Sequence, residues 1–405
     1  SFPTRRSSDL MDQRQRLKRK RMIRQKKMAG NAEYAYFDYG LVAVLIFLIC
    51  FGLIMLYSTS YYSAQIDYKG DGAFYFRRQL LFSGGSLLVM YVVTKVDYHR
   101  YTRYATILYV VSFILMALVQ TPLGVEVNGA RRWLRFPVIQ RFQPSEITKI
   151  AMILFIPYLI CKFGKKAYTK KGALQILLFG ILAAAGVFVL TENLSTAIIV
   201  FGISAVIFFV AYPRTRKIGI VFVCLVVGGL IAGQILGRLL ESSGNFRLQR
   251  ILSWVDPEKY AKSGAFQTMQ GLLAIGSGGF FGKGLGGSAQ KMVIPEPQND
   301  MILSIICEEL GVFGLIVVLV LFGMLLYRLM FIAQNAPDLY GSLIVTGVFA
   351  HIAIQVLLNV AVVLNVIPTT GITLPFISYG GTSAVFLMIE MGIVLNVSGK
   401  IKIRR

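Results

Sequence analysis

The chain has 405 residues, of which 56% are hydrophobic and 15% are charged, and its formal net charge is +23. So much apolar surface does not fit inside one water-soluble core, which excludes a soluble globular protein and predicts an all-α integral membrane protein. Much of the basic excess lies in the N-terminal tail and at the ends of apolar segments. There it sets topology and contacts anionic lipid, so we expect membrane lipid and no nucleic acid as its partner.

The first forty residues precede the first apolar segment. Residues 1–10 read like a translated sequencing adapter, with Met11 as a start directly after them, and we exclude these ten residues from the fold. Residues 11–40 are expected to be a basic cytoplasmic tail, and the polar, strongly basic run from Met11 to Lys27 within it is predicted to be disordered. Residues 401–405 are expected to form a second, shorter basic cytoplasmic end.

Apolar runs of about 20 residues, the length that crosses a bilayer, divide the membrane domain at 41–400 into ten predicted helices. They are expected at 41–57, 79–96, 104–120, 145–161, 173–190, 194–211, 218–240, 301–327, 341–364 and 382–398. An even number places both termini on one side, and the basic tail and basic connections make that side cytoplasmic. The outer connections would be 58–78, 121–144, 191–193, 241–300 and 365–381, where we expect the functional residues.

An arginine-rich stretch lies on the predicted outer face, against the usual bias of positive charge toward the cytoplasm. It contains Arg131, Arg132, Arg135 and Arg141, with Glu126 nearby as the counter-charge. A guanidinium group presents a planar fork of donors that matches phosphate. The stretch therefore predicts an anionic ligand, with phosphate as the natural choice, on the outer side.

Two ionisable residues open the helix expected at 145–161. Pro144 suits a first helical turn and Glu146 suits the positive end of the helix dipole. Glu146 and Lys149 are three residues apart and therefore share a helix face. Such a pair at the mouth of a membrane helix is a functional candidate, but the spacing fits a purely structural ion pair equally well.

The outer connection at 241–300 begins with Arg247 and Arg250 and continues into a glycine-rich run at 276–287. The run is not a P-loop, because Gly284 follows Lys283 where Ser or Thr is needed. Its glycines allow the backbone to approach a ligand or a helix closely, or they simply make the loop flexible. The connection ends at Asp300, which is either an ordinary helix N-cap or a catalytic base.

The connection at 365–381 contains two prolines and several glycines that break the helix at the membrane surface, which predicts a cavity wall. Within the spans, Gln355, Asn359 and Glu390 fit interhelical hydrogen bonding as well as a reactive role. His351 lacks the partners of a metal site or a nucleophile triad and is predicted to be structural.

Four motifs together resemble the SEDS cell-wall polymerases, the FtsW/RodA/SpoVE group. They are Gln143-Pro-Ser-Glu146, Pro295-Glu-Pro-Gln-Asn-Asp300, Glu308-Glu-Leu-Gly311 and Leu374-Pro-Phe-Ile-Ser-Tyr-Gly-Gly-Thr-Ser383. The likeness covers residues 40–400, and the wording of 365–373 is more similar to the division or sporulation branch than to the elongation branch. One position departs from the family: Asn193 stands where relatives commonly carry an aspartate, and Glu192 beside it is the only substitute.

The resemblance implies a peptidoglycan glycosyltransferase of the bacterial cell membrane that polymerises lipid II on the outer face, with inversion and release of undecaprenyl pyrophosphate. Asp300 matches the essential aspartate of the family and is assigned as the base. Glu146 and Lys149 match the ionisable pair of the central cavity. Further candidates for the substrate-binding surface are Arg131, Arg132, Arg247, Arg250, Lys291, Ser378 and Tyr379.

The resemblance also implies partners: lipid II and the nascent glycan strand, a class B penicillin-binding protein that supplies transpeptidation, and other divisome membrane proteins. A requirement for Mg²⁺ or Mn²⁺ stays open, because no carboxylate cluster in the sequence fixes a metal. Two other functions remain as alternatives. A lipid II flippase would need a charged path through the bilayer, and a non-catalytic divisome scaffold would need the tail and loops but not Asp300.

Overall fold

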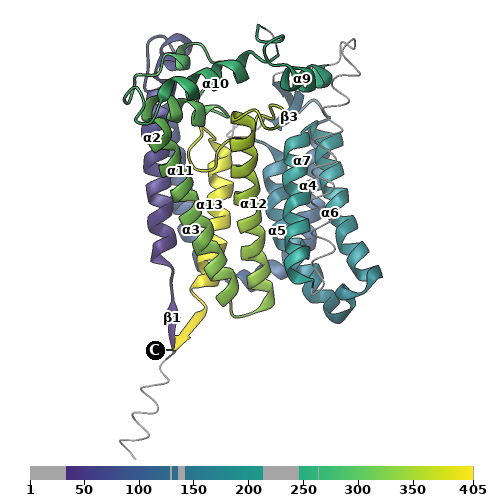
Figure 1. Ribbon diagram of the computed structural model, residues 1–405. Coiled ribbons are helices and arrows are strands. Elements are labelled where there is room, and N and C mark those ends of the chain that lie inside the picture. The colour runs from purple at the N-terminus through teal and green to yellow at the C-terminus, as the bar shows by residue number, and fades with distance from the viewer. Residues whose placement is uncertain (1–32, 128–129, 136–141, 213–245, 263, 405) are drawn as a thin grey trace, which may run out of the picture.

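The computed structural model describes residues 33–127, 130–135, 142–212, 246–262 and 264–404 (Figure 1). Within these ranges nine long helices run side by side. They are α2 (Tyr39–Asp67), α3 (Phe74–Lys95), α4 (Tyr101–Leu118), α5 (Pro144–Phe163), α6 (Lys170–Thr191), α7 (Leu194–Ala211), α11 (Ile302–Asn335), α12 (Leu339–Val363) and α13 (Thr382–Ser398). All of them except α3 and α13 are long and apolar enough to cross a membrane. The predicted helix at 218–240 lies outside the described residues.

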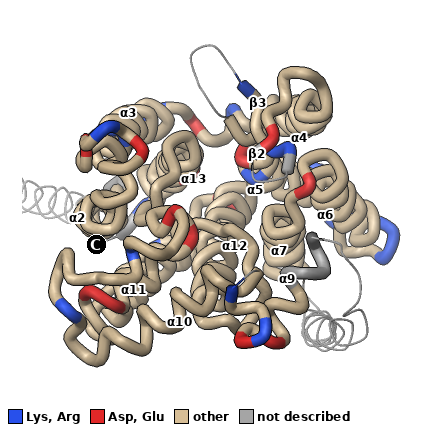
Figure 2. Tube along the Cα trace, turned by 90° about the horizontal axis from the view of Figure 1, so that it is seen from above, with Lys and Arg blue, Asp and Glu red and all other residues tan. Residues whose placement is uncertain are grey.

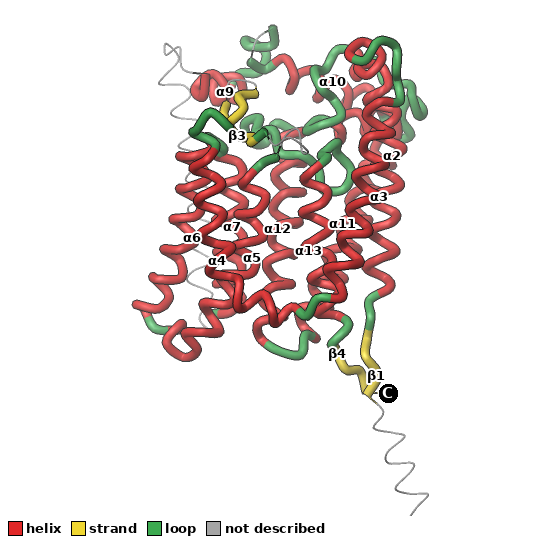
Figure 3. The backbone as a smooth tube through the Cα atoms, turned by 180° about the vertical axis from the view of Figure 1, so that it is seen from behind, coloured by secondary structure: helices red, strands yellow, loops and turns green. Residues whose placement is uncertain are grey.

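Both ends of the described chain lie at the same end of the bundle (Figures 1 and 3). Strand β1 (Glu33–Tyr36) pairs with β4 (Ile401–Arg404) in antiparallel register. The Asp38 carboxylate then caps α2 by accepting a hydrogen bond from the backbone N–H of Leu41 at 2.8 Å. Pairing with the C-terminal strand therefore orders residues 33–36, whereas the run from Met11 to Lys27 that was predicted to be disordered lies outside the described residues.

The opposite end of the bundle, which we call the outer end, carries the longer connections (Figure 3). Strands β2 (Gly124–Val127) and β3 (Ala130–Leu134) form a hairpin there, and an isolated bridge joins Leu134 to Phe142. The connection at 241–300 contains two helices, α9 (Phe246–Val255) and α10 (Phe266–Gly278), and a 3₁₀ turn, η3 (Gln290–Met292). The long outer connection that was expected here therefore includes regular structure.

Helix α11 is kinked at Gly311, whose backbone has φ +68°. The glycine-rich run packs against this kink: the backbone N–H of Val312 donates to Gly279 at 3.0 Å, and that of Gly284 donates to Glu309 at 2.9 Å. A side chain at Gly311 would meet the carbonyl oxygen of Phe280 at 2.3 Å. Of the two interpretations of the glycine-rich run, close approach to a helix is the one that the structure confirms.

Helices α5 and α12 lie inside the bundle, where the other helices surround them (Figure 2). About two thirds of the residues in their apolar windows are buried, the highest share among the candidate spans. Helix α5 packs against α4, α7, α12 and α13, and α12 packs against α7, α11 and α13. Polar side chains on these two helices therefore face protein, so each of them needs a partner.

Candidate active site

Asp300 lies two residues before α11 and is partly buried. Its carboxylate oxygen Oδ1 accepts a hydrogen bond from the side-chain amide of Gln267 on α10 at 3.1 Å. Its backbone carbonyl accepts one from the side-chain amide of Asn359 on α12 at 2.9 Å. The N-cap residue of α11 is Met301, so the ordinary N-cap interpretation of Asp300 is wrong. Helices α10 and α12 therefore both hold Asp300, the first through its carboxylate and the second through its backbone carbonyl.

The broken segment between α12 and α13 forms a wall beside Asp300. The Asn359 amide also donates to the carbonyl of Ile372 at 2.8 Å, and the Gln355 amide donates to that of Thr373 at 2.9 Å. Gly371 has φ +71°, and a Cβ there would lie 4.0 Å from Oδ2 of Asp300. The predicted break is thus confirmed, and helix α12 satisfies the carbonyls that it frees.

Ser378 and Tyr379 hold the shape of this segment. The Ser378 hydroxyl accepts a hydrogen bond from the backbone N–H of Leu374 at 2.8 Å, which closes a tight turn. The backbone N–H of Tyr379 donates to the carbonyl of Gln298, two residues before Asp300, at 3.0 Å. The Tyr379 ring meets that of Tyr75 edge to face at 5.1 Å. Both predicted residues therefore connect to the surroundings of Asp300 through the backbone.

Glu146 and Lys149 form an ion pair in the first turns of α5, with 2.9 Å between Oε1 and Nζ. The side chains are 10% and 5% exposed. The shared face that the i, i+3 spacing predicts is confirmed. Because α5 lies inside the bundle, the pair brings two opposite charges to the outer end of its interior.

The two arginines of the hairpin have different surroundings. Arg131 is half exposed and lies 3.8 Å from Glu126. Arg132 donates to the backbone carbonyl of Glu192, in the turn between α6 and α7, at 3.4 Å. Ser195 follows that turn, and its hydroxyl donates to the carbonyl of Thr370, next to Gly371, at 3.0 Å. Arg132 is therefore connected to the Asp300 wall, whereas Arg131 pairs within the hairpin.

Asn193, which stands where an aspartate was expected from the resemblance, has a structural role in the turn between α6 and α7. Glu192 adopts a left-handed backbone with φ 50° and ends α6. Asn193 follows as the N-cap of α7, and its side-chain oxygen accepts from the backbone N–H of Thr196 at 3.1 Å. Asparagine and aspartate cap helices about equally well, so this position keeps its capping function in the chain.

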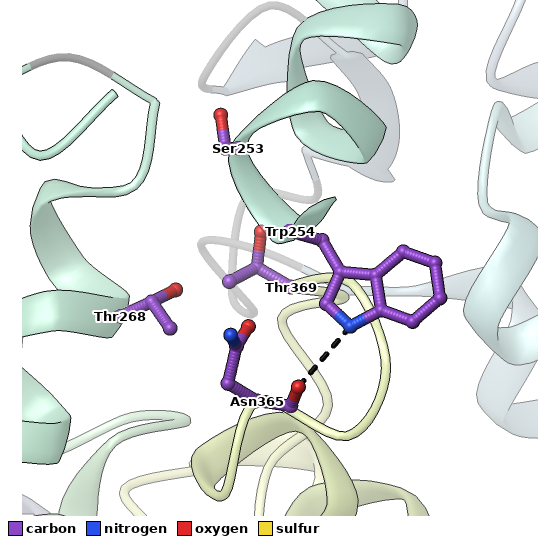
Figure 4. Close-up of a pocket in the computed structure, with 5 residues that line it drawn as sticks. All are labelled: Ser253, Trp254, Thr268, Asn365 and Thr369. Atoms are coloured by element: carbon purple, nitrogen blue, oxygen red, sulfur yellow. Dashed lines mark hydrogen bonds between the residues drawn. The ribbon is translucent and has the colours of Figure 1, made fainter. Parts of the chain in front are cut away.

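Arg247 and Arg250 lie on α9 at the outer end, and their side chains are outside the described part of the structure. Helix α9 docks on the broken segment through Trp254, whose indole N–H donates to the carbonyl of Asn365 at 3.1 Å (Figure 4). Ser253, Thr268 and Thr369 complete the lining of a pocket at this contact that is too small to admit water. The contact therefore fixes α9 over the segment and is no ligand site.

Lys291 does not have the predicted cavity setting. Its ammonium pairs with Glu309 at 3.1 Å and donates to the carbonyl of Gly286 at 2.8 Å. Glu309 is fully buried and also accepts a hydrogen bond from the hydroxyl of Ser58 on α2 at 2.7 Å. The neighbouring Glu308 pairs with Lys283 at 2.7 Å. Both lysines therefore attach the glycine-rich run to α11.

The geometry supports proton transfer at Asp300. A carboxylate that is fixed through its side chain and its backbone, and that is still partly exposed, can accept a proton from a bound hydroxyl group. In the described part of the chain, no group of three or more His, Cys, Asp and Glu residues could hold a metal ion. Sequence analysis missed Gln267, because nothing in the spacing of residues relates it to a carboxylate 33 positions away.

Comparison with known proteins agrees with these observations. The family model described as "Cell cycle protein", named for FtsW, RodA and SpoVE, matches residues 39–403. The chain is 40% identical over 366 residues to stage V sporulation protein E of Bacillus subtilis, covering 89% of the chain and 96% of that protein. It is 34% identical over 371 residues to a protein of Trichlorobacter lovleyi named probable peptidoglycan glycosyltransferase FtsW, covering 91% and 95%.

Solved structures give the same result. A chain of a peptidoglycan synthase complex, studied for the coordination of polymerisation and crosslinking, matches with a TM-score of 0.73 and 27% identity over 89% of this chain and 97% of that one. The rod shape-determining protein RodA of Thermus thermophilus matches with a TM-score of 0.64 and 27% identity, over 89% and 96%. The expected helical multi-pass membrane fold is confirmed, and the chain belongs to the FtsW/RodA/SpoVE family.

Proposed function

We propose that this protein is a peptidoglycan glycosyltransferase that polymerises lipid II into glycan strands at the extracytoplasmic face of the cell membrane, during division or sporulation. The names of its relatives support the activity. The single observation that carries the mechanism is the setting of Asp300 at the outer end of the bundle, where Gln267 holds its carboxylate and Asn359 holds its backbone carbonyl.

In the proposed reaction, Asp300 accepts the proton of the acceptor sugar 4-hydroxyl while that oxygen attacks the anomeric carbon of the donor. The new glycosidic C–O bond forms as the bond between the anomeric carbon and the pyrophosphate oxygen breaks. The electron pair leaves with undecaprenyl pyrophosphate. A single displacement inverts the anomeric carbon, so an α-linked donor gives a β-linked strand without a covalent enzyme intermediate.

The leaving pyrophosphate needs cationic donors more than it needs a general acid. Arg132 and Arg131 on the hairpin are the candidates that the geometry supports, since Arg132 is connected to the Asp300 wall through the α6–α7 turn. Arg247 and Arg250 are candidates by their place on α9. Glu146 and Lys149 present a buried pair of charges that we assign to the central cavity. The proposed glycosyl transfer uses no metal ion in any step.

A transpeptidase partner follows from the function. A structural relative of this chain comes from a complex in which polymerisation and crosslinking are coordinated. By analogy, we propose a class B penicillin-binding protein as the partner that crosslinks the strand, together with other membrane proteins of the divisome.

Asp300→Asn tests the base directly. Asparagine keeps an oxygen that accepts the hydrogen bond from Gln267 but cannot take up the proton, so we expect glycan formation to fall by about 10²- to 10⁴-fold. The measurement is the length and amount of glycan made from labelled lipid II by the protein purified with its transpeptidase partner. Glu296→Gln, four residues earlier and exposed, is the matched control and should retain activity. Wild-type activity in Asp300→Asn would exclude the mechanism and leave a flippase or a scaffold.

The hairpin arginines give a second test. Arg132→Ala removes the cation that is connected to the Asp300 wall, so we expect the KM for lipid II to rise by about tenfold, as for one charge-assisted hydrogen bond. Arg131→Ala removes an exposed charge that pairs with Glu126 and should have a smaller effect. If the double variant has wild-type kinetics, the hairpin does not contact the pyrophosphates.

A further inference from the structure

A line of buried polar side chains runs through the interior to the Asp300 wall. Glu390 on α13 contacts Nδ1 of His351 on α12 at 2.8 Å, and His351 Nε2 contacts Oε1 of Gln355 at 2.9 Å. The Gln355 amide then donates to the carbonyl of Thr373. His351, Gln355 and Asn359 are four residues apart and therefore lie on one face of α12. We call Glu390, His351 and Gln355 the polar ladder.

The ladder is sealed inside the protein. Glu390 and His351 are each 1% exposed, and Gln355 is 6% exposed. In place of water, each polar group has a hydrogen-bond partner in a different helical turn or a different element. The positions of the three side chains therefore depend on one another. Burial of this kind is costly when one member is lost, because its neighbour is left without a partner.

The donor and the acceptor of each hydrogen bond in the ladder can be assigned by starting from the carbonyl of Thr373, the last acceptor. The carbonyl of Thr373 can only accept, so the Gln355 amide nitrogen faces it and the Gln355 oxygen faces His351. His351 Nε2 must then carry a hydrogen and donate. Nδ1 faces a carboxylate, and a hydrogen must lie between these two atoms, on either the ring or Glu390, for the contact to be favourable. The whole ladder therefore has one orientation.

The ladder ends on irregular backbone and not on another helix. Gln355 holds the carbonyl of Thr373, and one turn further along α12 Asn359 holds those of Ile372 and Asp300. Gly371, at the start of this 371–373 backbone, lies beside the Asp300 carboxylate, since a Cβ there would be 4.0 Å from Oδ2. The orientation of Gln355, which His351 and Glu390 impose, therefore fixes the backbone that lies against the proposed base.

We propose that Glu390, His351 and Gln355 are positioning residues for glycosyl transfer, which act by holding the 371–373 backbone and through it the setting of Asp300. The inference rests on the proposed function of Asp300. It assigns a catalytic consequence to side chains that would otherwise only join helices α12 and α13. No member of the ladder contacts substrate in this scheme.

Substitutions at Glu390 separate hydrogen bonding from charge. Glu390→Gln carries an amide that can donate to Nδ1 while Nε2 still donates to Gln355, so the ladder keeps its orientation and we expect activity near wild type. Glu390→Leu and Gln355→Leu break the ladder at its two ends. We expect kcat to fall by about tenfold or more, the effect of a lost hydrogen bond to a charged group, while KM for lipid II stays the same.

A control substitution on α12, outside the ladder, shows whether any loss of a buried polar group in this helix lowers kcat. Thr346 is buried on α12, and its hydroxyl bonds only to the carbonyl of Ser342 among the described residues. Thr346→Val should leave kcat unchanged. All variants are compared by thermal unfolding in detergent and by co-purification with the transpeptidase partner, so that a fall in kcat is interpreted only where both are retained.

A second readout does not depend on catalysis. The four natural cysteines are replaced by alanine, Asp300→Cys is introduced, and the rate of modification by a water-soluble thiol reagent is measured with and without Glu390→Leu. We expect the ladder variant to change this rate at least severalfold and Glu390→Gln to leave it unchanged. This readout stands even if Asp300→Asn retains activity, so failure of the base and failure of the ladder are distinguishable.

Two results would overturn the proposal. One is a Glu390→Leu protein that unfolds at the wild-type temperature with wild-type kcat and an unchanged labelling rate at position 300. The other is an equal loss of kcat in Glu390→Gln and Glu390→Leu, because the role would then belong to the charge of Glu390 and not to the orientation of the ladder.

Discussion

Gly371 limits what can stand beside the proposed base. Its φ of +71° is a backbone conformation that an alanine adopts only with strain, at a cost of about 1–2 kcal/mol, and the added Cβ would lie 4.0 Å from Asp300 Oδ2. Gly371→Ala should therefore lower kcat by about tenfold with little change in KM. Gly276→Ala, on α10, meets nothing within 4 Å and has ordinary φ, so it is the matched control. Equal kinetics in the two variants would contradict this role.

At the scale of single residues, the sequence predicts partners that are close in the chain but not those that are distant in it. The i, i+3 spacing predicts that Glu146 and Lys149 share a face, because a helix brings such residues together wherever it lies. The place of Asp300 at the end of a loop fits an N-cap as well as a base, and the resemblance to the family is what assigns it as the base. Gln267 and Asn359 contact it across 33 and 59 positions, and contacts at such separations depend on how whole helices pack.

At the scale of elements, the glycine-rich run is held at the outer end of α11 by two ion pairs, of which Lys291–Glu309 is buried and Lys283–Glu308 is partly exposed. In the Lys291–Glu309 pair the side chains are 8% and 0% exposed. Such a pair contributes little when both partners are replaced, whereas loss of one partner leaves a buried charge and costs about 3–5 kcal/mol. Substitution of one or both residues of this pair therefore tests whether charge pairing attaches the glycine-rich run to α11.

Lys291→Met should lower the free energy of unfolding by about 3 kcal/mol or more. Glu309→Gln keeps an acceptor for Ser58 but removes the charge, so the double variant should regain most of that loss. Thermal unfolding in detergent measures both. The exposed pair Arg77–Asp71 is the control, and Arg77→Met should cost less than about 1 kcal/mol. A double variant as unstable as Lys291→Met would show that hydrogen bonds of the ammonium, and not charge pairing, hold the run.

The sequence predicts long elements better than short ones. The bounds of α7 and α13 agree with the expected 194–211 and 382–398, because each apolar stretch is delimited by polar or helix-breaking residues. Helix α10 and the β1–β4 pair were not expected. Both are short, and they are stabilised by tertiary contacts with α11 and with the other chain end.

At the scale of the whole molecule, a polar cluster closes the end of the bundle opposite the outer end. Asp97 contacts Lys400 and His99, and His99 also contacts Asp338 at 3.0 Å. The backbone N–H of Tyr98 donates to Asn396 at 2.9 Å. The cluster connects the α3–α4 connection to the start of α12 and the end of α13. The hydrogen bond from Lys400, and then that from the backbone N–H of His99, hold the pKa of Asp97 well below its ordinary value.

This lowered pKa gives a pH dependence of known sign. A carboxylate with a depressed folded-state pKa contributes stability that is complete above its ordinary value of 3.8 and is lost as the pH falls below it. Asp97→Asn should therefore unfold at a lower temperature than wild type at pH 7. The difference in unfolding temperature between the two proteins should become smaller below pH 3.8. Lys400→Met removes the main cause of the lowered Asp97 pKa. Its unfolding temperature should therefore differ from that of wild type in the same pH-dependent way as that of Asp97→Asn. A gap that stays constant down to pH 3 would rule out this linkage.

The pairing of β1 with β4 has a consequence for chain connectivity. Residues 33 and 404 are register partners, so the segment from 33 to 404 is almost a closed ring, with its gap at the end of the bundle opposite the outer end. A short linker from residue 404 to residue 33 would complete the ring. New termini could then be opened in the turn at 164–168 between α5 and α6, at that same end of the bundle, giving a permuted enzyme whose outer-end chemistry is untouched.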